Sequence, residues 1–334
     1  LSTACAGSPR LPNPRRFPLA KAAKVTILDP TSLVGDELVP RLAAQAPEVA
    51  HQYFHSQASG DHLIVEVGGK AAVVAPLTDV VELENAGLVI ITDNPAKSLG
   101  QKLADFLTAH PEIPCVDLSR PGVLPGPPAF WPLPGANRLL FPDPALILPA
   151  MVLRALAPLN PRRAFFSVLS PVSTLGGEAV DELAAQAVAR LSGEKPKTRV
   201  LPTVMAFDAF PYPERNFGCQ ESQLAAMFPQ VEIGFHSIFA GVFHAHAAHA
   251  TVTLESPARE AQVRELLLEA GFVPHRARKP LTPSQGAGQD HAIAWVLATR
   301  GSTVNLWAVG DHLLLQAKTA CEAVLQLFST SPAA

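Results

Sequence analysis

Four histidines fall in one apolar stretch, and two of them are spaced like neighbours on one face of a strand. They are His236, His244, His246 and His249. Residues i and i+2 of a strand point to the same face, so His244 and His246 would share a face and His249 would lie on the other. Imidazoles at that spacing can bind zinc or another transition metal. No carboxylate pattern such as HExxH accompanies them, so we assign no metal ligand.

Cysteine is the other residue type here with strong chemistry, because its thiolate can attack a carbonyl carbon. The four cysteines are far apart and form no CxxC pair, which favours reduced, cytosolic thiols. Cys115 falls in an expected strand, Cys321 falls in the last expected helix, and the others are Cys5 and Cys219.

A third pattern lies at the turn between an apolar strand and a helix near the N-terminus. A dinucleotide-binding turn needs glycines so that its backbone can approach the pyrophosphate. Here the turn from Asp29 to Gly35 reads DPTSLVG. Asp29 brings a carboxylate to the turn and Pro30 removes a backbone donor. We therefore do not expect tight binding of a dinucleotide.

The elements that would position these residues form two sets. In the first, short strands alternate with amphipathic helices, which implies a parallel sheet. We expect strands at 24–28, 62–67, 70–76, 88–93 and 113–119, and helices at 36–45 and 96–110. The Pro- and Gly-rich segment 121–136 is expected to be a loop that leads to the second set.

The second set predicts a mixed sheet whose strands could pair across a dimer. Its expected strands are one at 163–172, a long β-rich stretch at 231–255 and a hairpin that turns at Arg300-Gly301. Its expected helices cover 145–156, 176–193, 258–271 and 313–328.

Length and composition limit the class of protein. A chain of 334 residues suggests two domains. A hydrophobic fraction of 48% and a mean hydropathy of +0.20 suit a surface that is buried in an oligomer. The net charge of −3 argues against nucleic acid, and no apolar run is long enough for a membrane helix. We expect residues 1–23, rich in Pro and Arg, to be a disordered tail, with a truncated leader as the alternative.

From Lys24 to Phe328 the order of these segments resembles the aspartate-semialdehyde dehydrogenase family. The best matches are VSTLGGEAVDELAAQ, MAFDAFP and VNLWAVGDHL, which look like the family's VSGAG helix region, AFNxxP stretch and LWxVxDNL segment. The resemblance implies an α/β protein. Its Rossmann-like nucleotide-binding domain would span 24–144 and include the C-terminal helix at 311–330, and its α+β dimerisation and substrate domain would span 145–310.

The resemblance also implies a chemistry for that fold. In the family a cysteine thiolate attacks the aldehyde, a hydride passes to NADP, phosphate takes the acyl group and a histidine handles the proton. The nucleophile follows an Asn-Pro pair at the start of a helix. The segment FPDPALILPAM puts Ala145 or Leu146 at that position, and neither can act as a nucleophile. His246 retains the histidine position.

Other substrate positions of the family are only partly kept. The carboxylate-binding arginine becomes Phe239, and a glutamine aligns with the shorter Ser170. In place of the family's ExK pattern, Glu214 is kept, Phe217 takes the lysine position, and Arg215 is the residue that could compensate.

The cofactor positions are eroded as well. Of the family's GATGxVG turn only Thr31, Val34 and Gly35 survive. The SRSAGK segment, whose arginine contacts the 2′-phosphate of NADP, begins here with Ser56-Gln57, so the bidentate phosphate donor is missing. The resemblance thus implies NADP as cofactor, while these substitutions predict weak binding.

We therefore predict a catalytically inactive relative of these dehydrogenases that serves as a structural or regulatory homologue. It would be a cytoplasmic homodimer, or a heterodimer with a related subunit, and would bind a nucleotide or carboxylate weakly. One alternative is an active NADP-dependent semialdehyde dehydrogenase of amino-acid biosynthesis that uses an unrecognised nucleophile such as Cys219. The other is a metal-binding protein built on the histidine cluster.

Overall fold

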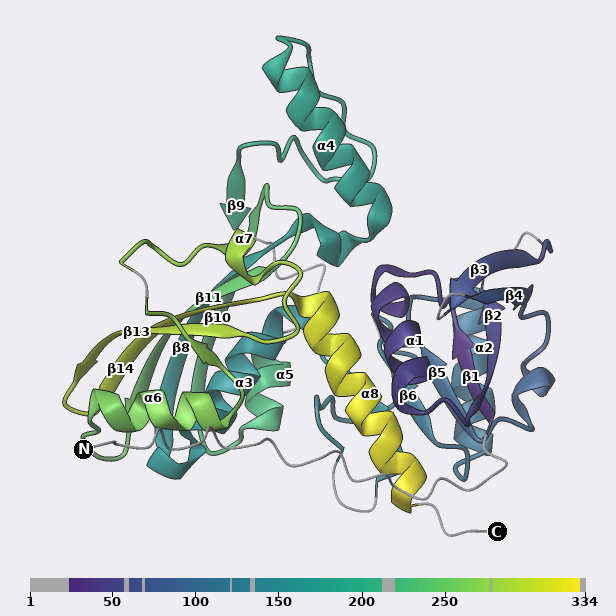
Figure 1. The fold of residues 1–334 in the computed structure, drawn as a ribbon, viewed down its shortest axis with the longest axis horizontal. Helices are drawn as coiled ribbons and strands as arrows, with labels where there is room; N and C mark the ends of the chain where they lie inside the picture. Colours follow the sequence, from purple (N-terminus) through teal and green to yellow (C-terminus); the bar gives the residue numbers. More distant parts are fainter. Residues whose placement is uncertain are drawn as a thin grey trace, which may run out of the picture.

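The strands form two seven-stranded sheets, each covered by helices (Figure 1). The structure is a computed structural model that describes residues 24–56, 60–67, 70–120, 122–132, 136–211, 220–276 and 278–330. The predicted α/β class, with a largely parallel first sheet and a mixed second sheet, is confirmed. The expected tail at 1–23 lies outside the described residues.

The first sheet, sheet A, has the order β3-β4-β2-β1-β5-β6-β7, and of its described pairs only β3–β4 is antiparallel. The strand order runs outward from β1 in both directions. In such sheets ligands bind beside the carboxyl ends of the strands where the order reverses, here β1 and β5. The strands are β1 Lys24–Leu28, β2 Ala50–His55, β3 Leu63–Val67, β4 Lys70–Pro76, β5 Leu88–Ile91, β6 Cys115–Asp117 and β7 Arg138–Leu140.

Helices α1 (Leu33–Gln45) and α2 (Lys97–Ala109) accompany sheet A, with a 3₁₀ turn, η1, at Val80–Leu83. The expected start of the first helix, at residue 36, is three residues too late. The helix begins at Leu33 because the Ser32 side chain accepts a hydrogen bond from the Gly35 N–H and so acts as its N-cap.

The second sheet, sheet B, has the order β12-β13-β14-β11-β8-β10-β9, with parallel pairs at β10–β8 and β12–β13. The predicted hairpin is confirmed as β13–β14. Its Gly301 has a φ of 59°, a left-handed conformation that favours glycine. The strands are β8 Pro161–Ser170, β9 Ala209–Pro211, β10 Glu232–Ala240, β11 His246–Leu254, β12 Val273–Pro274, β13 Ile293–Arg300 and β14 Thr303–Gly310.

The two faces of sheet B differ. The inner face packs on helices α3, α5 and α6, which lie along one side of the sheet in Figure 1. On the outer face a row of polar and aromatic side chains crosses five strands in register: His236, Ser167, His249, Trp307 and Trp295. The remaining elements are η2 Pro144–Leu146, α3 Ile147–Leu156, η3 Ala157–Leu159, η4 Val172–Leu175, α4 Gly177–Leu191, α5 Gln220–Met227, α6 Glu260–Glu269 and α7 Pro283–Gly286.

The last helix, α8 (His312–Thr330), lies between the two sheets and packs against α1 (Figure 1). Asp311 caps it by accepting the Leu313 N–H at 3.1 Å. The Cys321 thiol lies 3.5 Å from Gln45 Oε1 on α1. One apolar cluster therefore runs from sheet A through α8 and α3 into sheet B. Within the described part of the chain, no helix combines the length and apolarity needed to cross a membrane.

Candidate functional site

A cavity of about 680 Å³ opens at the carboxyl ends of β1 and β5, where the strand order of sheet A predicts a ligand site. We call it the cleft. The β1–α1 turn, the segments after β5 and β6, the η4–α4 segment and the start of α8 contribute to its walls. The polar side chains of the walls include Thr31, Ser32, Thr92, Arg120, Ser173 and Gln316.

The β1–α1 turn keeps its left-handed backbone although glycine has been replaced. Asp29 has a φ of 58°. Its Oδ1 accepts the backbone N–H of Ser56 at 2.7 Å, so the carboxylate faces the end of β2 and not the open cleft, where the sequence analysis expected it. Burial raises the pKa of Asp29 above its usual value, although the hydrogen bond from Ser56 opposes the shift. The side chain therefore joins two loops.

Gly35 is the one residue of the expected fingerprint that the geometry requires. A Cβ at this position would lie 2.5 Å from the Pro30 carbonyl oxygen, so only glycine lets α1 approach the turn this closely. The N–H of Gly35 donates to Ser32 Oγ at 3.0 Å, and Ser32 is also within 3.0 Å of Thr92 Oγ1. This donor at the helix N-terminus is thus already used inside the protein. Of the other expected cofactor residues, Thr31 and Val34 line the cleft.

Arg120 is the only lysine or arginine among the described residues that line the cleft, which also contains Asp93 and Glu178. Its backbone N–H donates to Asn94 Oδ1, which joins the ends of β5 and β6. The buried Asp117 orders the same loop by accepting N–H groups from Ser119 at 2.9 Å and Leu124 at 2.7 Å. The cleft therefore offers an anion one cation beside two carboxylates.

The predicted nucleophile position lies at a helix start, but it carries alkyl groups only. Asp143 caps η2 by accepting the Ala145 N–H at 2.8 Å, and η2 leads into α3. Ala145 and Leu146 are both buried. A thiol here would have the helix N-terminus to stabilise its thiolate, whereas the side chains present have no reactive atom.

His246 is fully buried against a second histidine that the sequence analysis did not anticipate. Its ring and that of His312, the first residue of α8, are perpendicular with centroids 4.7 Å apart. None of the four ring nitrogens has a hydrogen-bond partner among the described residues. Burial, reinforced by the Arg120 charge, lowers the pKa of His246 to about 3, and burial also lowers the pKa of His312. Both rings are therefore neutral at physiological pH.

The histidine cluster does not have the predicted strand geometry. β11 begins at His246, and the preceding Ala245 has a left-handed φ of 69°, so His244 is not on the strand. The expectation that His244 and His246 share a strand face is therefore wrong. His249 lies on the outer face opposite Trp307. Among the described residues, no group of three or more His, Cys, Asp or Glu side chains is placed to hold a metal ion.

The two described cysteines are buried thiols inside the fold. Burial raises the pKa of Cys115 well above its usual value and that of Cys321 to about 12, so neither forms a thiolate at neutral pH. Cys219, Glu214 and Arg215 lie outside the described residues.

The two remaining substrate positions are part of the packing. The hydroxyl oxygens of Ser170 and Ser237 are 2.8 Å apart and buried. Phe239 stacks on Phe210, with ring centroids 6.1 Å apart, in a small apolar cluster under α4. An apolar contact thus occupies the position at which the resemblance implied a carboxylate-binding arginine.

No protein-family model and no curated protein sequence matches the chain. Solved structures do match. Aspartate semialdehyde dehydrogenase II from Vibrio cholerae has a TM-score of 0.76 at 18% identity, over 91% of this chain and 98% of that one. A probable aspartate-semialdehyde dehydrogenase from Pseudomonas aeruginosa has a TM-score of 0.73 at 21% identity, over 91% and 97%.

A third structure, aspartate semialdehyde dehydrogenase from Francisella tularensis, has a TM-score of 0.74 at 12% identity, over 90% of this chain and 98% of that one. Each match spans nearly the whole length of both chains. The chain therefore has the fold of the aspartate-semialdehyde dehydrogenases.

Proposed function

We propose that this protein is a non-catalytic relative of the aspartate-semialdehyde dehydrogenases that keeps the cleft as a weak binding site. One observation carries the proposal. The resemblance places the nucleophile at the helix start Pro144–Leu146, and the residues there, Ala145 and Leu146, have buried alkyl side chains. Dehydrogenation through a thioester needs a thiolate at this position, because the thiolate forms the covalent adduct with the aldehyde from which hydride is expelled.

The state of His246 supports the same proposal. A general acid or base works best with a pKa near the working pH and must reach the group whose proton it moves. Burial lowers the pKa of His246 to about 3, and its ring packs against His312. The retained histidine therefore contributes packing, and the proton-transfer role implied by the resemblance has no counterpart in this geometry.

For the cofactor, we infer weak binding of NADP in the cleft. The N-terminus of α1 still points at the cleft, and Arg120 supplies one positive charge, which together favour an anion. Against this, Ser32 already takes the Gly35 N–H, and Asp93 and Glu178 line the same cavity. Weak binding without turnover fits a regulatory role.

Isothermal titration of NADP and NADPH, together with an assay of aldehyde oxidation in the presence of phosphate, tests the proposal. We expect a dissociation constant of roughly 0.1 mM or weaker and no turnover. Turnover would overturn the proposal, and a Cys219→Ser variant would then show whether that thiol acts as the nucleophile. Tight binding without turnover would leave the protein non-catalytic but would contradict weak cofactor binding.

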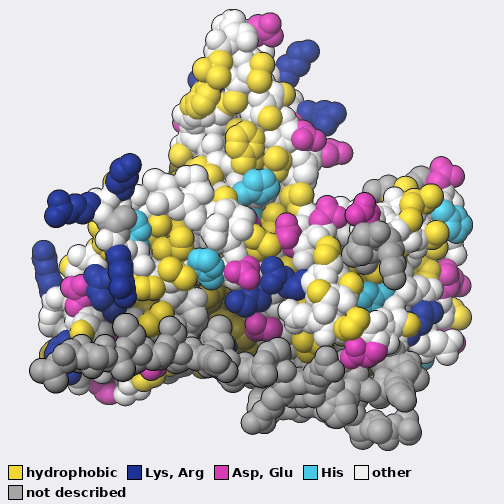
Figure 2. Space-filling model, viewed as in Figure 1, with side chains coloured by type: hydrophobic (Ala, Val, Ile, Leu, Met, Phe, Trp, Pro, Cys, Tyr) yellow, Lys and Arg dark blue, Asp and Glu magenta, His cyan; other side chains and the backbone are white. Residues whose placement is uncertain are grey.

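We also propose that the protein dimerises through the outer face of sheet B and the projecting α4 segment. On the sheet, Phe165 is 53% exposed and Leu297 44% exposed. Helix α4 stands away from the body in Figure 1, and Figure 2 shows hydrophobic side chains along its surface. Val188 and Leu191 are among its exposed apolar residues. Large apolar side chains exposed on one sheet face and on a projecting helix are the kind of surface that an interface buries.

Light scattering after size-exclusion chromatography tests the dimer. We expect a dimer for the unmodified protein and a monomer for Phe165→Glu, because a charge would be buried without a partner. The matched control is Leu268→Glu on α6, which is 57% exposed on the opposite side of the sheet and should remain dimeric. A monomeric unmodified protein would contradict homodimerisation.

A further inference from the structure

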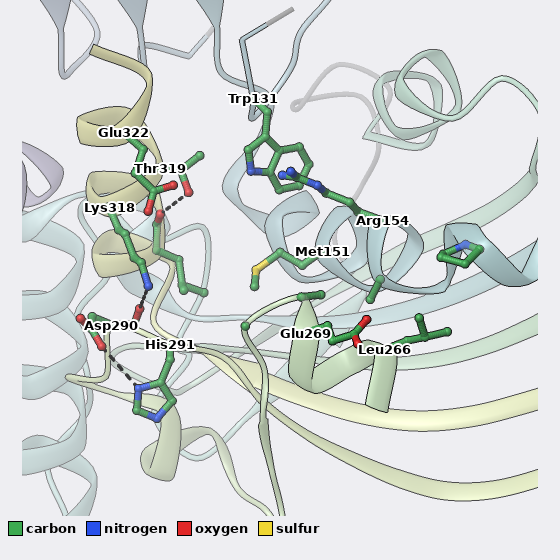
Figure 3. Close-up of a pocket in the computed structure, with 15 residues that line it drawn as sticks. Trp131, Met151, Arg154, Leu266, Glu269, Asp290, His291, Lys318, Thr319 and Glu322 are labelled. Carbon is green, nitrogen blue, oxygen red and sulfur yellow. Dashed lines mark hydrogen bonds and ion pairs between the residues drawn. The ribbon is translucent and has the colours of Figure 1, made fainter. Parts of the chain in front are cut away.

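A second cavity, of about 440 Å³, lies on another side of α8 from the cleft. Figure 3 shows it bordered by α3, α6, α8 and the Asp290-His291 segment. Its volume falls within the ~300–1,000 Å³ range of small-molecule sites. The two cavities have no lining residue in common. We call this second cavity the α8 pocket.

The charged side chains of the α8 pocket are only partly paired with one another. Asp290 is already engaged: it lies 3.8 Å from Arg41 and 3.4 Å from His291 Nδ1, and its carbonyl oxygen accepts a bond from Lys318 Nζ at 3.4 Å. In the part of the chain that the structure describes, Glu269 and Glu322 have no hydrogen bond or ion pair.

Arg154 is the unpaired cation of the pocket. Its guanidinium lies over the Trp131 ring, 4.4 Å from the centroid, and has no carboxylate partner among the described residues. Stacking on an indole fixes the direction of the guanidinium while leaving its N–H groups available. In Figure 3, Arg154 and Glu322 are on opposite sides of the pocket, with Met151 between them.

The floor between these charges is apolar. Met151 from α3, Leu266 from α6 and Leu315 from α8 contribute to it. Counting all charged residues of the lining, two positive side chains, Arg154 and Lys318, face three carboxylates, those of Glu269, Asp290 and Glu322. The pocket therefore complements a ligand with one carboxylate, two cationic groups and an aliphatic chain between them.

We propose that the α8 pocket binds an α-amino acid with a second, terminal cationic group, such as a diamino acid. The ligand's carboxylate pairs with Arg154, its two ammonium groups pair with Glu322 and Glu269, and its methylene chain covers Met151. A phosphate or a dicarboxylate does not fit, because each would meet the two unpaired glutamates. The proposal does not depend on what occupies the cleft.

Isothermal titration with three matched probes tests the proposal. L-Lysine carries all three charges, L-norleucine lacks the terminal ammonium, and 1,5-diaminopentane lacks the carboxylate. We expect saturable binding of L-lysine and binding at least about tenfold weaker for each of the other two, since each loses one charge-assisted hydrogen bond. No saturable heat with L-lysine up to about 10 mM would overturn the proposal.

Variants locate the binding site. Arg154→Gln and Glu322→Gln are both at exposed positions and should fold, and each should weaken L-lysine binding about tenfold or more. Glu322→Gln should weaken the binding of 1,5-diaminopentane and of L-norleucine to different extents. The first probe retains both ammonium groups, whereas the second retains one ammonium group and the carboxylate. The control is Glu265→Gln, an exposed residue one turn before Glu269 on α6 that does not line the pocket.

L-Lysine binding that is unchanged in both pocket variants would place the ligand elsewhere and would overturn the proposal. Repeating the titration with NADPH present separates this site from the cleft. L-Lysine binding that persists at saturating NADPH supports two independent sites, whereas competition would assign the ligand to the cleft and contradict the α8 pocket. Failure of NADPH to bind at all leaves the L-lysine experiment unaffected.

Discussion

The β1–α1 turn lines the cleft, and the His246–His312 contact directly precedes Leu313 of its wall. Each begins with a residue other than glycine in left-handed backbone. In the turn, Asp29 compensates for its conformation, because its carboxylate accepts the Ser56 N–H. At the second place the methyl side chain of Ala245 can make no such bond, and the imidazoles of His246 and His312 have no hydrogen-bond partner in the part of the chain that the structure describes. The hydrogen bond at the turn therefore stabilises the fold, whereas the unpaired ring nitrogens of the histidine contact destabilise it.

The largest expected effect that tests this comparison is the pH dependence of the free energy of unfolding. The folded-state pKa of both histidines is lowered, to about 3 for His246, while the unfolded value is about 6.5. The unfolded state therefore binds more protons below pH ~6.5, and stability falls as the pH falls. We expect His246 to reduce the free energy of unfolding by roughly 2 kcal/mol between pH 6.5 and 5, and His312 to reduce it further in the same direction.

Urea unfolding of the His246→Leu, His312→Leu double variant at pH 7.5, 6.5 and 5 measures this contribution. We expect a much flatter pH dependence than in the unmodified protein, and higher stability at pH 7.5 by about 1–3 kcal/mol, because leucine needs no hydrogen-bond partner. Carboxyl groups with a raised pKa, such as Asp29, titrate in both proteins and cancel in the difference. An unchanged pH slope would mean that the histidines are hydrated in solution.

The second prediction concerns how tightly the turn is built. Gly35→Ala should lower stability by about 1–3 kcal/mol, since its Cβ would lie 2.5 Å from the Pro30 carbonyl oxygen. Gly100→Ala in α2 is the matched control, because its Cβ would meet Pro95 at 3.5 Å, an ordinary contact. It should stabilise by about 0.5–1 kcal/mol through helix propensity. Equal thermal shifts for the two variants would show that the turn is not closely packed.

The smallest effect separates strain from packing at Ala245. Ala245→Gly loses a buried methyl group and adds chain entropy, but it relieves a left-handed conformation that costs about 1–2 kcal/mol. We expect a net change below about 0.5 kcal/mol. Ala250→Gly, also buried but within β11, the strand that follows Ala245, has no strain to relieve and should cost more than about 1 kcal/mol. Equal losses would indicate that Ala245 is unstrained.

Most elements were predictable because their periodicity is local. The strand at Lys24–Leu28 and the hairpin at Arg300-Gly301 follow from apolar runs and turn residues. Two strands of sheet A were missed. β2 has the sequence AHQYFH, in which polar residues interrupt the apolar pattern of a strand. β7 consists of RLL alone and follows a Pro- and Gly-rich loop. Sheet pairing stabilises both strands, and pairing has no signature in a short segment.

Within the site, the sequence shows which of the family's functional residues are replaced, but it does not predict the contacts that the new residues make. The contact between His246 and His312 joins residues far apart in the sequence, and no local pattern predicts it. The hydrogen bond from Ser56 to Asp29 likewise depends on how two loops meet. The stacking of Arg154 on Trp131 arises from a loop and a helix with no shared pattern.

The position of helix α8 also has a consequence for co-translational folding. It is synthesised after every other described element, yet it covers α1, contributes Leu313 and Gln316 to the cleft, and contributes Lys318 to the other pocket. Until it emerges, the apolar side of α1 remains open to solvent and neither cavity has all its walls. A nascent chain that stops short of α8 therefore exposes a surface that chaperones and proteases recognise, and only a chain that includes α8 can bind a ligand in either cavity.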